Sequence, residues 1–100
     1  MTKKIKTARF IYTVPYKQTE GIFEKVAGYD VEIFDWIKTF VSKRHKSWVV
    51  FETTTGKNIA GGDTIDSAII AAKNQLELYG RDKTLTAIAG FQKVPDENQG

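Results

Sequence analysis

The chain has 100 residues, so a single domain with one hydrophobic core is expected. Hydrophobic residues make up 41% of the chain and charged residues 27%, which is typical of a folded domain and excludes wholesale disorder. There is no cysteine and only one histidine, which excludes a disulfide framework, a thiolate zinc site, a catalytic cysteine and a site of several histidines. No apolar run approaches the ~20 residues that cross a bilayer, and the N-terminus lacks the apolar segment of a secretory signal, so we expect a cytoplasmic protein.

Positive charge is concentrated in the first half of the chain. The net charge is +3, but residues 1–50 carry ten Lys or Arg against five Asp or Glu, whereas residues 51–100 carry five against seven. The basic residues form one group near the start and a second group at 43–46. Such a patch attracts phosphate backbones, anionic membranes or acidic proteins, although solvated chain ends and a solvated turn are the simpler interpretation.

Alternating side chains predict strands along the first half of the chain. Residues 5–14 place Phe10, Tyr12 and Val14 on one face of a strand that Pro15 ends. Residues 16–28 fit a loop with a short strand at 22–26. Residues 29–43 carry a long strand-like pattern in which Asp35 marks a turn or bulge.

Two turns and a pair of glycines divide the next segment. Residues 44–47 fit a hairpin turn, and residues 48–53 fit a strand rich in aromatic and β-branched side chains. A second turn at 54–57 precedes a short strand at 57–60, which Gly61 and Gly62 are expected to break.

Residues 64–79 give the clearest helical pattern. Ile65, Ala68, Ile69, Ala72, Leu76 and Tyr79 recur at spacings of three and four and form one apolar stripe, which predicts packing against a sheet. Asp63 or Thr64 fits the N-cap, and Gly80 fits the residue after the helix. Ile70 and Leu78 widen the stripe, which points to a second covering element, a partner or a homodimer.

A shorter helix is predicted at 83–89, capped by Asp82 and ended by Gly90. We therefore predict an α+β fold. It has a four- to five-stranded, mainly antiparallel meander, with the 64–79 helix on one face and the 83–89 helix beside it. Residues 1–91 form the single domain, and residues 92–100 form a flexible tail.

No residue pattern indicates catalysis. Asp30, Glu32 and Asp35 form an acidic cluster that Glu52 and Asp63 could extend into a cation site, but Asp30 and Glu32 have the spacing of a strand's solvent face. His45 fits a hairpin better than a general base, and Ser42, Ser47 and Ser67 lack the context of a nucleophile. Residues 61–64 open a helix without the lysine of a phosphate-binding loop. We therefore expect no enzyme, no cofactor and no metal site.

A nucleic-acid-binding module is the alternative function. It requires the basic residues to form one edge, and Trp36, Phe40 or Trp48 to be exposed enough to stack on bases. The candidate binding residues are Arg9, Lys43, Arg44, His45 and Lys46.

Residues 48–80 resemble the N-terminal domain of HicB-type antitoxins, through a strand, a turn, a short strand and a Gly-Asp-Thr entry into a helix. The matching residues are Gly62, Asp63, Thr64, Ala68, Ala72, Leu76 and Tyr79. The resemblance implies a sheet-plus-helix module that binds and occludes a partner protein without catalysis. Residues 1–47 differ from the family pattern, and no DNA-binding segment is expected after residue 91. The strand order also resembles that of double-stranded-RNA-binding domains, but Asp63 and Asp66 stand where that family has basic residues.

The predicted function is therefore a small, non-enzymatic partner-binding or inhibitory module. The size and absence of cysteine are typical of phage or mobile-element products. A protein partner is expected, although no residue pattern identifies it.

Overall fold

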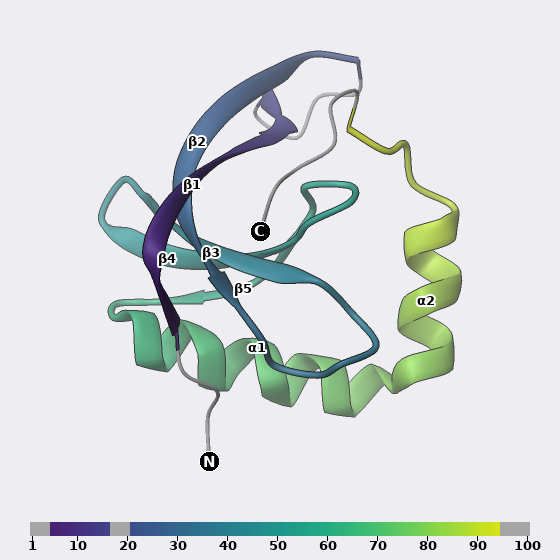
Figure 1. Cartoon of the computed structure of the whole chain (residues 1–100). Helices are drawn as coiled ribbons and strands as arrows, with labels where there is room; N and C mark the ends of the chain where they lie inside the picture. Colours follow the sequence, from purple (N-terminus) through teal and green to yellow (C-terminus); the bar gives the residue numbers. More distant parts are fainter. Residues whose placement is uncertain (1–4, 17–20, 95–100) are drawn as a thin grey trace.

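The computed structural model describes residues 5–16 and 21–94, with side chains from residue 10 onward. Strands β1 (Ile5–Pro15), β2 (Phe23–Val31), β3 (Thr39–Arg44), β4 (Ser47–Glu52) and β5 (Asn58–Gly62) are followed by helices α1 (Ile65–Tyr79) and α2 (Arg81–Ala89). Each strand pairs antiparallel with the next, giving one five-stranded sheet in the order β1-β2-β3-β4-β5 (Figure 1). This arrangement confirms the predicted α+β meander.

Helix α1 covers one face of the sheet, below β3, β4 and β5 (Figure 1). Thr64 is the N-cap: its side chain accepts from the Ser67 amide, while the Ser67 hydroxyl accepts from the Thr64 amide. The predicted stripe packs against the sheet from Ile65 to Leu76, but its last member, Tyr79, is exposed, contrary to the prediction. Its fully buried members are Ala68, Ile69, Ala72 and Leu76. The sequence-predicted helix at 64–79 is thereby confirmed.

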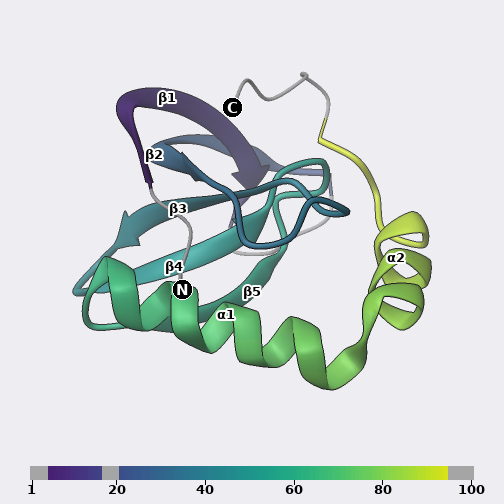
Figure 2. The same cartoon turned by 60° about the horizontal axis from the view of Figure 1, so that its bottom comes forward.

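A second core lies on the opposite face, because the β1–β2 hairpin curls over the sheet (Figure 2). Tyr12 of β1 stacks on Phe40 of β3 with ring centroids 3.8 Å apart, although β2 lies between these strands in the pairing order. Phe40 stacks in turn on Phe51 of β4 at 5.0 Å. Gly28 permits the close approach of β2 and β3, since a Cβ atom there would lie 2.6 Å from the Val41 carbonyl oxygen.

The hydroxyl of Tyr12 is buried in this second core and has no hydrogen-bond partner among the described residues. Burial, and secondarily the Asp30 carboxylate, raise the pKa of the Tyr12 hydroxyl above its ordinary value. An unpaired buried hydroxyl costs about 1 kcal/mol or more.

Tyr12→Phe is therefore expected to raise the free energy of unfolding by about 1 kcal/mol, which raises the melting temperature by roughly 4–8 °C. Thermal denaturation followed by circular dichroism measures this shift. Tyr79→Phe, at a side chain that is 56% exposed, is the matched control and should leave the melting temperature unchanged. A lower melting temperature for Tyr12→Phe would show that the hydroxyl is hydrogen-bonded.

Several predicted boundaries were wrong. Strand β2 runs without interruption over Phe23–Val31, where a loop with a strand at 22–26 was expected, and residues 32–38 form the connection to β3. Strand β5 includes Gly61 and Gly62, which were expected to break it. A Cβ atom at Gly61 would lie 2.9 Å from the Trp48 carbonyl oxygen. Glycine at this position therefore allows β5 to lie close to β4.

The start of α2 was also predicted incorrectly. The helix begins at Arg81 rather than at residue 83, and its N-cap is Gly80, with no side-chain capping bond. Asp82 lies in the first turn, where a carboxylate favours the positive end of the helix dipole.

Candidate binding surfaces

Helix α2 is the least buried element of the fold. Gly80 is both the C-cap of α1 and the N-cap of α2, and its φ of 85° turns the chain sharply between them. In Figure 1, α2 leaves the end of α1 and stands beside the sheet. None of its nine residues is fully buried. Since isolated helices of this length are marginal in water, α2 gains from any further packing.

An apolar groove lies between α2, the end of α1 and the start of β5, with a volume of about 210 Å³. We call it the α2 groove. Lys57, Lys83 and Glu52 also line it. The Glu52 carboxylate is buried and bonded within the turn after β4, so the accessible charges of the lining are the two ammonium groups. Its apolar lining comes from Ile37, Ile59, Leu76, Tyr79, Ile88 and Phe91.

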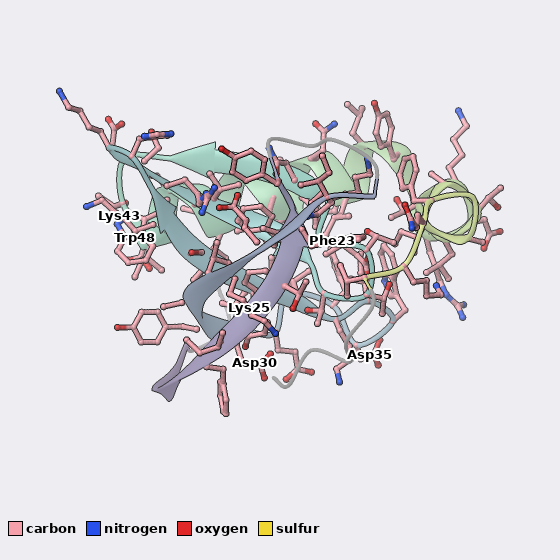
Figure 3. All side chains as sticks on the ribbon, turned by 90° about the horizontal axis from the view of Figure 1, so that it is seen from above. Phe23, Lys25, Asp30, Asp35, Lys43 and Trp48 are labelled. Atoms are coloured by element: carbon pink, nitrogen blue, oxygen red, sulfur yellow. The ribbon has the colours of Figure 1, made fainter. Side chains whose placement is uncertain are left out.

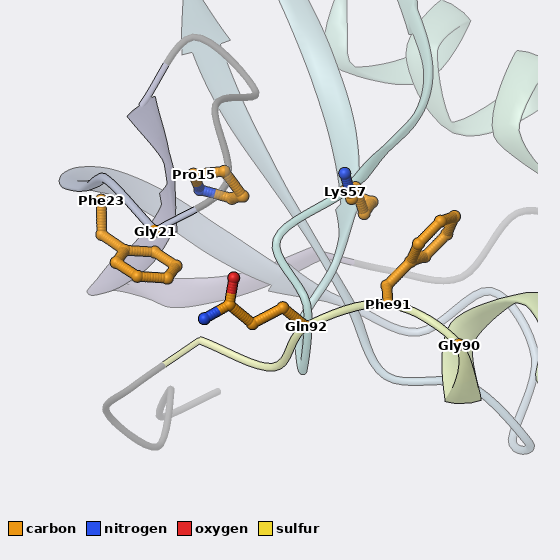
Figure 4. A pocket seen from close by; sticks show the side chains of 7 residues that line it. All are labelled: Pro15, Gly21, Phe23, Lys57, Gly90, Phe91 and Gln92. Atoms are coloured by element: carbon orange, nitrogen blue, oxygen red, sulfur yellow. The ribbon is translucent and has the colours of Figure 1, made fainter.

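A second hollow, of about 380 Å³, continues from the α2 groove. Lys57 and Phe91 line both hollows, and the Lys57 ammonium lies 4.9 Å from the centre of the Phe91 ring. The remaining lining residues come from the end of β1, from Gly21 and the start of β2, and from the segment after α2 (Figure 4). The two hollows therefore form one track that joins segments distant in the sequence.

The basic hairpin between β3 and β4 has the predicted position at residues 44–47. His45 is exposed and takes a φ of 56°, which makes it a turn residue. Arg44 is partly neutralised, because its guanidinium lies 2.8 Å from a carboxylate oxygen of Glu24 on β2. Lys46 is exposed at the turn, and the Arg9 side chain lies outside the described side chains.

Lys43 pairs with Trp48 across the hairpin, and its ammonium lies 5.4 Å from the centre of the Trp48 ring (Figure 3). Trp48 also contacts Tyr29 of β2, with ring centroids 6.4 Å apart. The other aromatic candidates for base stacking lie elsewhere in the fold. Phe40 is fully buried, and Trp36 is half-buried against Phe34.

These side chains surround a hollow of about 280 Å³, which we call the seam hollow. The ladder between β2 and β3 ends at the Gly28–Ser42 pair, although β3 continues to Arg44. Beyond that pair the strands separate, and the Ser42 hydroxyl donates to the Ala27 carbonyl across the gap. The curl that builds the second core thus opens the seam. Lys25, Tyr29, Lys43, Arg44 and Trp48 contribute to its lining.

The acidic cluster lies at the end of β2 and in the connection between β2 and β3. Asp30, Glu32 and Asp35 line one shallow hollow of about 220 Å³, but no group of three or more possible metal ligands occurs among the residues that the structure describes. Glu52 is engaged elsewhere, in the turn after β4, and Asp63 is exposed ahead of α1. Within residues 5–16 and 21–94, neither helix has the length and apolarity that a membrane span requires.

No family model, curated protein or solved structure matches the chain. The resemblance of residues 48–80 to HicB-type antitoxins therefore stays a prediction. Contacts, burial and charge are the basis on which a function can be proposed.

The sequence analysis did not predict that the residues of the α2 groove, or those of the seam hollow, lie together. The α2 groove combines Ile59 of β5, Ile88 of α2 and Phe91 beyond it, and no sequence spacing links these residues. The one feature of the sequence that pointed to the α2 groove was the short helix at its edge, which has too few apolar residues to pack fully against the core. Of the seam hollow, Lys43, Arg44 and Trp48 were singled out, whereas Tyr29 was taken only as part of a strand pattern.

Proposed function

We propose that this chain is a non-enzymatic module that binds a protein partner in the α2 groove. The observation that carries the proposal is the apolar groove beside a helix with no fully buried residue. Exposed apolar side chains that gather in one place are typical of protein interaction sites. Tyr79 and Phe91, which line the groove, are 56% and 44% exposed.

The size and charge of the groove favour a peptide segment as the occupant. Pockets for small ligands usually measure about 300–1,000 Å³, and the α2 groove, at about 210 Å³, is smaller. It suits one or two apolar side chains of a partner, and the adjoining hollow accommodates the rest of a segment. Lys57 and Lys83 favour acidic residues beside the apolar anchor.

Selection from a display library of random peptides tests this proposal. We expect the selected peptides to carry an aromatic or aliphatic residue flanked by Asp or Glu. Ile88→Asp, which places a charge in the groove, should weaken their binding by about thirtyfold or more, the effect of losing a strong interface anchor.

Thr86→Asp is the matched control, because Thr86 lies on the same helix, is exposed and does not line the groove. Peptides that bind both variants as tightly as the wild-type protein would show that the groove is not the docking surface. Circular dichroism confirms that α1 and the sheet remain folded in each variant.

Nucleic-acid binding is a second candidate function, which the contact between Lys43 and Trp48 favours. A cation beside an accessible aromatic ring is the combination that binds phosphate and base together. A steep fall in affinity with rising salt, measured with short DNA and RNA, would support this function.

A further inference from the structure

We infer that the seam hollow, rather than the tip of the basic hairpin, binds single-stranded nucleic acid. The inference rests on the second candidate function and names its surface and its ligand. It does not depend on the protein partner proposed for the α2 groove.

The aromatic rings of the seam hollow are suited to a base. Tyr29 and Trp48 are half-buried, so each ring is held by the core and keeps part of its surface exposed. They come from the two strands that flank β3, and their ring planes are tilted by 42°, so the two rings are not stacked on each other. Stacking on aromatic side chains requires unpaired bases, which a single strand offers and a duplex does not.

The charged residues around these rings favour a phosphate backbone. Lys25, Lys43 and Arg44 line the hollow, and no acidic residue does. Glu24 pairs with Arg44 and is not part of the lining. Lys43 lies over the Trp48 ring, which places a cation where the phosphate beside a stacked base would lie. At the hairpin tip, by contrast, His45 and Lys46 are exposed, and no aromatic ring contact is found for either within the described residues.

The opened seam supplies the space. Strands β2 and β3 separate after Gly28 and Ser42, leaving a hollow of about 280 Å³ between their ends. A continuous ladder would have joined the two strands here by backbone hydrogen bonds. The seam hollow therefore combines two aromatic rings, the Lys43 ammonium and open space.

Fluorescence of Trp48 provides the test. The chain has two tryptophans, so Trp36→Phe leaves Trp48 as the single reporter. An oligo(dT) of about 15 nucleotides, which matches the site size of comparable single-strand binders, is titrated against this variant at low salt. We expect saturable quenching by oligo(dT). Inorganic polyphosphate, which carries the charge without bases, should leave the fluorescence unchanged.

Three substitutions locate the site by fluorescence anisotropy of labelled oligo(dT). Trp48→Leu should weaken binding about fivefold or more, the effect of losing one stacked base. Lys43→Gln should weaken binding and make the salt dependence shallower by somewhat less than one unit of slope. Lys46→Gln removes the same charge at the hairpin tip and should have little effect. Since Lys43 is exposed, Lys43→Gln remains informative even if Trp48→Leu fails to fold.

The possible results distinguish nucleic-acid binding as a function from the seam hollow as its site. Equal affinity for duplex and single strand, with Lys43→Gln and Lys46→Gln equally damaging, would overturn the seam hollow as the site while keeping nucleic-acid binding as a function. No binding of DNA or RNA at low salt would overturn both. Quenching by oligo(dT), together with loss of binding in Trp48→Leu and Lys43→Gln but not in Lys46→Gln, would support both.

Discussion

Replacing Ala72 with aspartate is expected to unfold the domain. Ala72 is fully buried in the middle of α1, where the helix packs on the sheet between other residues of the core. An ionised carboxylate without a partner costs far more than a hydrogen bond when it is buried, and the whole domain is stable by only about 5–15 kcal/mol. The expected result is loss of the cooperative melting transition, measured by circular dichroism.

Ile70→Asp is the matched control for this substitution. It introduces the same charge into the same helix, at a side chain that is 50% exposed. We expect its free energy of unfolding to stay within about 0.5 kcal/mol of the wild-type value. A folded Ala72→Asp protein with a nearly unchanged melting temperature would mean that Ala72 does not face the sheet.

Replacing Glu52 with alanine is expected to have the next largest effect. The buried carboxylate of Glu52 accepts four hydrogen bonds, from the amides and hydroxyls of Thr54 and Thr55, at 2.6–2.9 Å. These bonds hold the turn between β4 and β5. In the same turn, Gly56 approaches β1 so closely that a Cβ atom would lie 2.8 Å from the Val14 Cα. Losing the carboxylate leaves amides of the turn without their acceptor.

The expected loss for Glu52→Ala is about 3 kcal/mol of unfolding free energy, or roughly 12–24 °C in melting temperature. Chemical denaturation measures the free energy directly. Glu77→Ala is the control, because Glu77 is exposed and pairs with Lys73 on the surface of α1. The loss of unfolding free energy in Glu77→Ala should not exceed about 0.5 kcal/mol. Equal effects of the two substitutions would show that the Glu52 network does not stabilise the turn.

This turn also bears on the proposed function, because Glu52 and Lys57 line the α2 groove. The segment after α2 is tied to the same turn, where the Val94 amide donates to the Thr54 carbonyl. The groove is therefore bordered on one side by a well-bonded turn and on the other by a weakly packed helix. A partner that fills the groove would stabilise α2 more than the sheet.

The sequence pattern correctly predicted which residues share a face in the elements where apolar side chains recur at a regular period. The stripe of α1 repeats every three to four residues, so Ala72 was correctly placed against the sheet; in β1, which repeats every two residues, Tyr12 and Val14 were correctly placed on one face. The hairpin at 44–47 was also predicted, since polar residues there separate two apolar strands. Local chemistry decides such features, and local chemistry is visible in the sequence.

Other predictions were wrong because packing between distant segments overrides the local pattern. Gly61 was read as a strand breaker, whereas the tertiary structure uses its missing side chain to let β5 approach Trp48. Asp82 was read as a helix cap, whereas Gly80 turns the chain and starts α2 two residues earlier than expected. In both positions the residue type was noticed, but its role depended on neighbours distant in the chain.

The sequence by itself determined the class of fold, the order of its elements and the face that α1 buries, because periodicity and turn residues act over a few residues. Only the tertiary structure decided that β1 and β2 curl over the sheet to form a second core around Phe40. That curl opens the seam hollow, and the turn at Gly80 sets α2 beside the sheet to form the α2 groove. Both surfaces arise from contacts between elements far apart in the sequence, which no local pattern encodes.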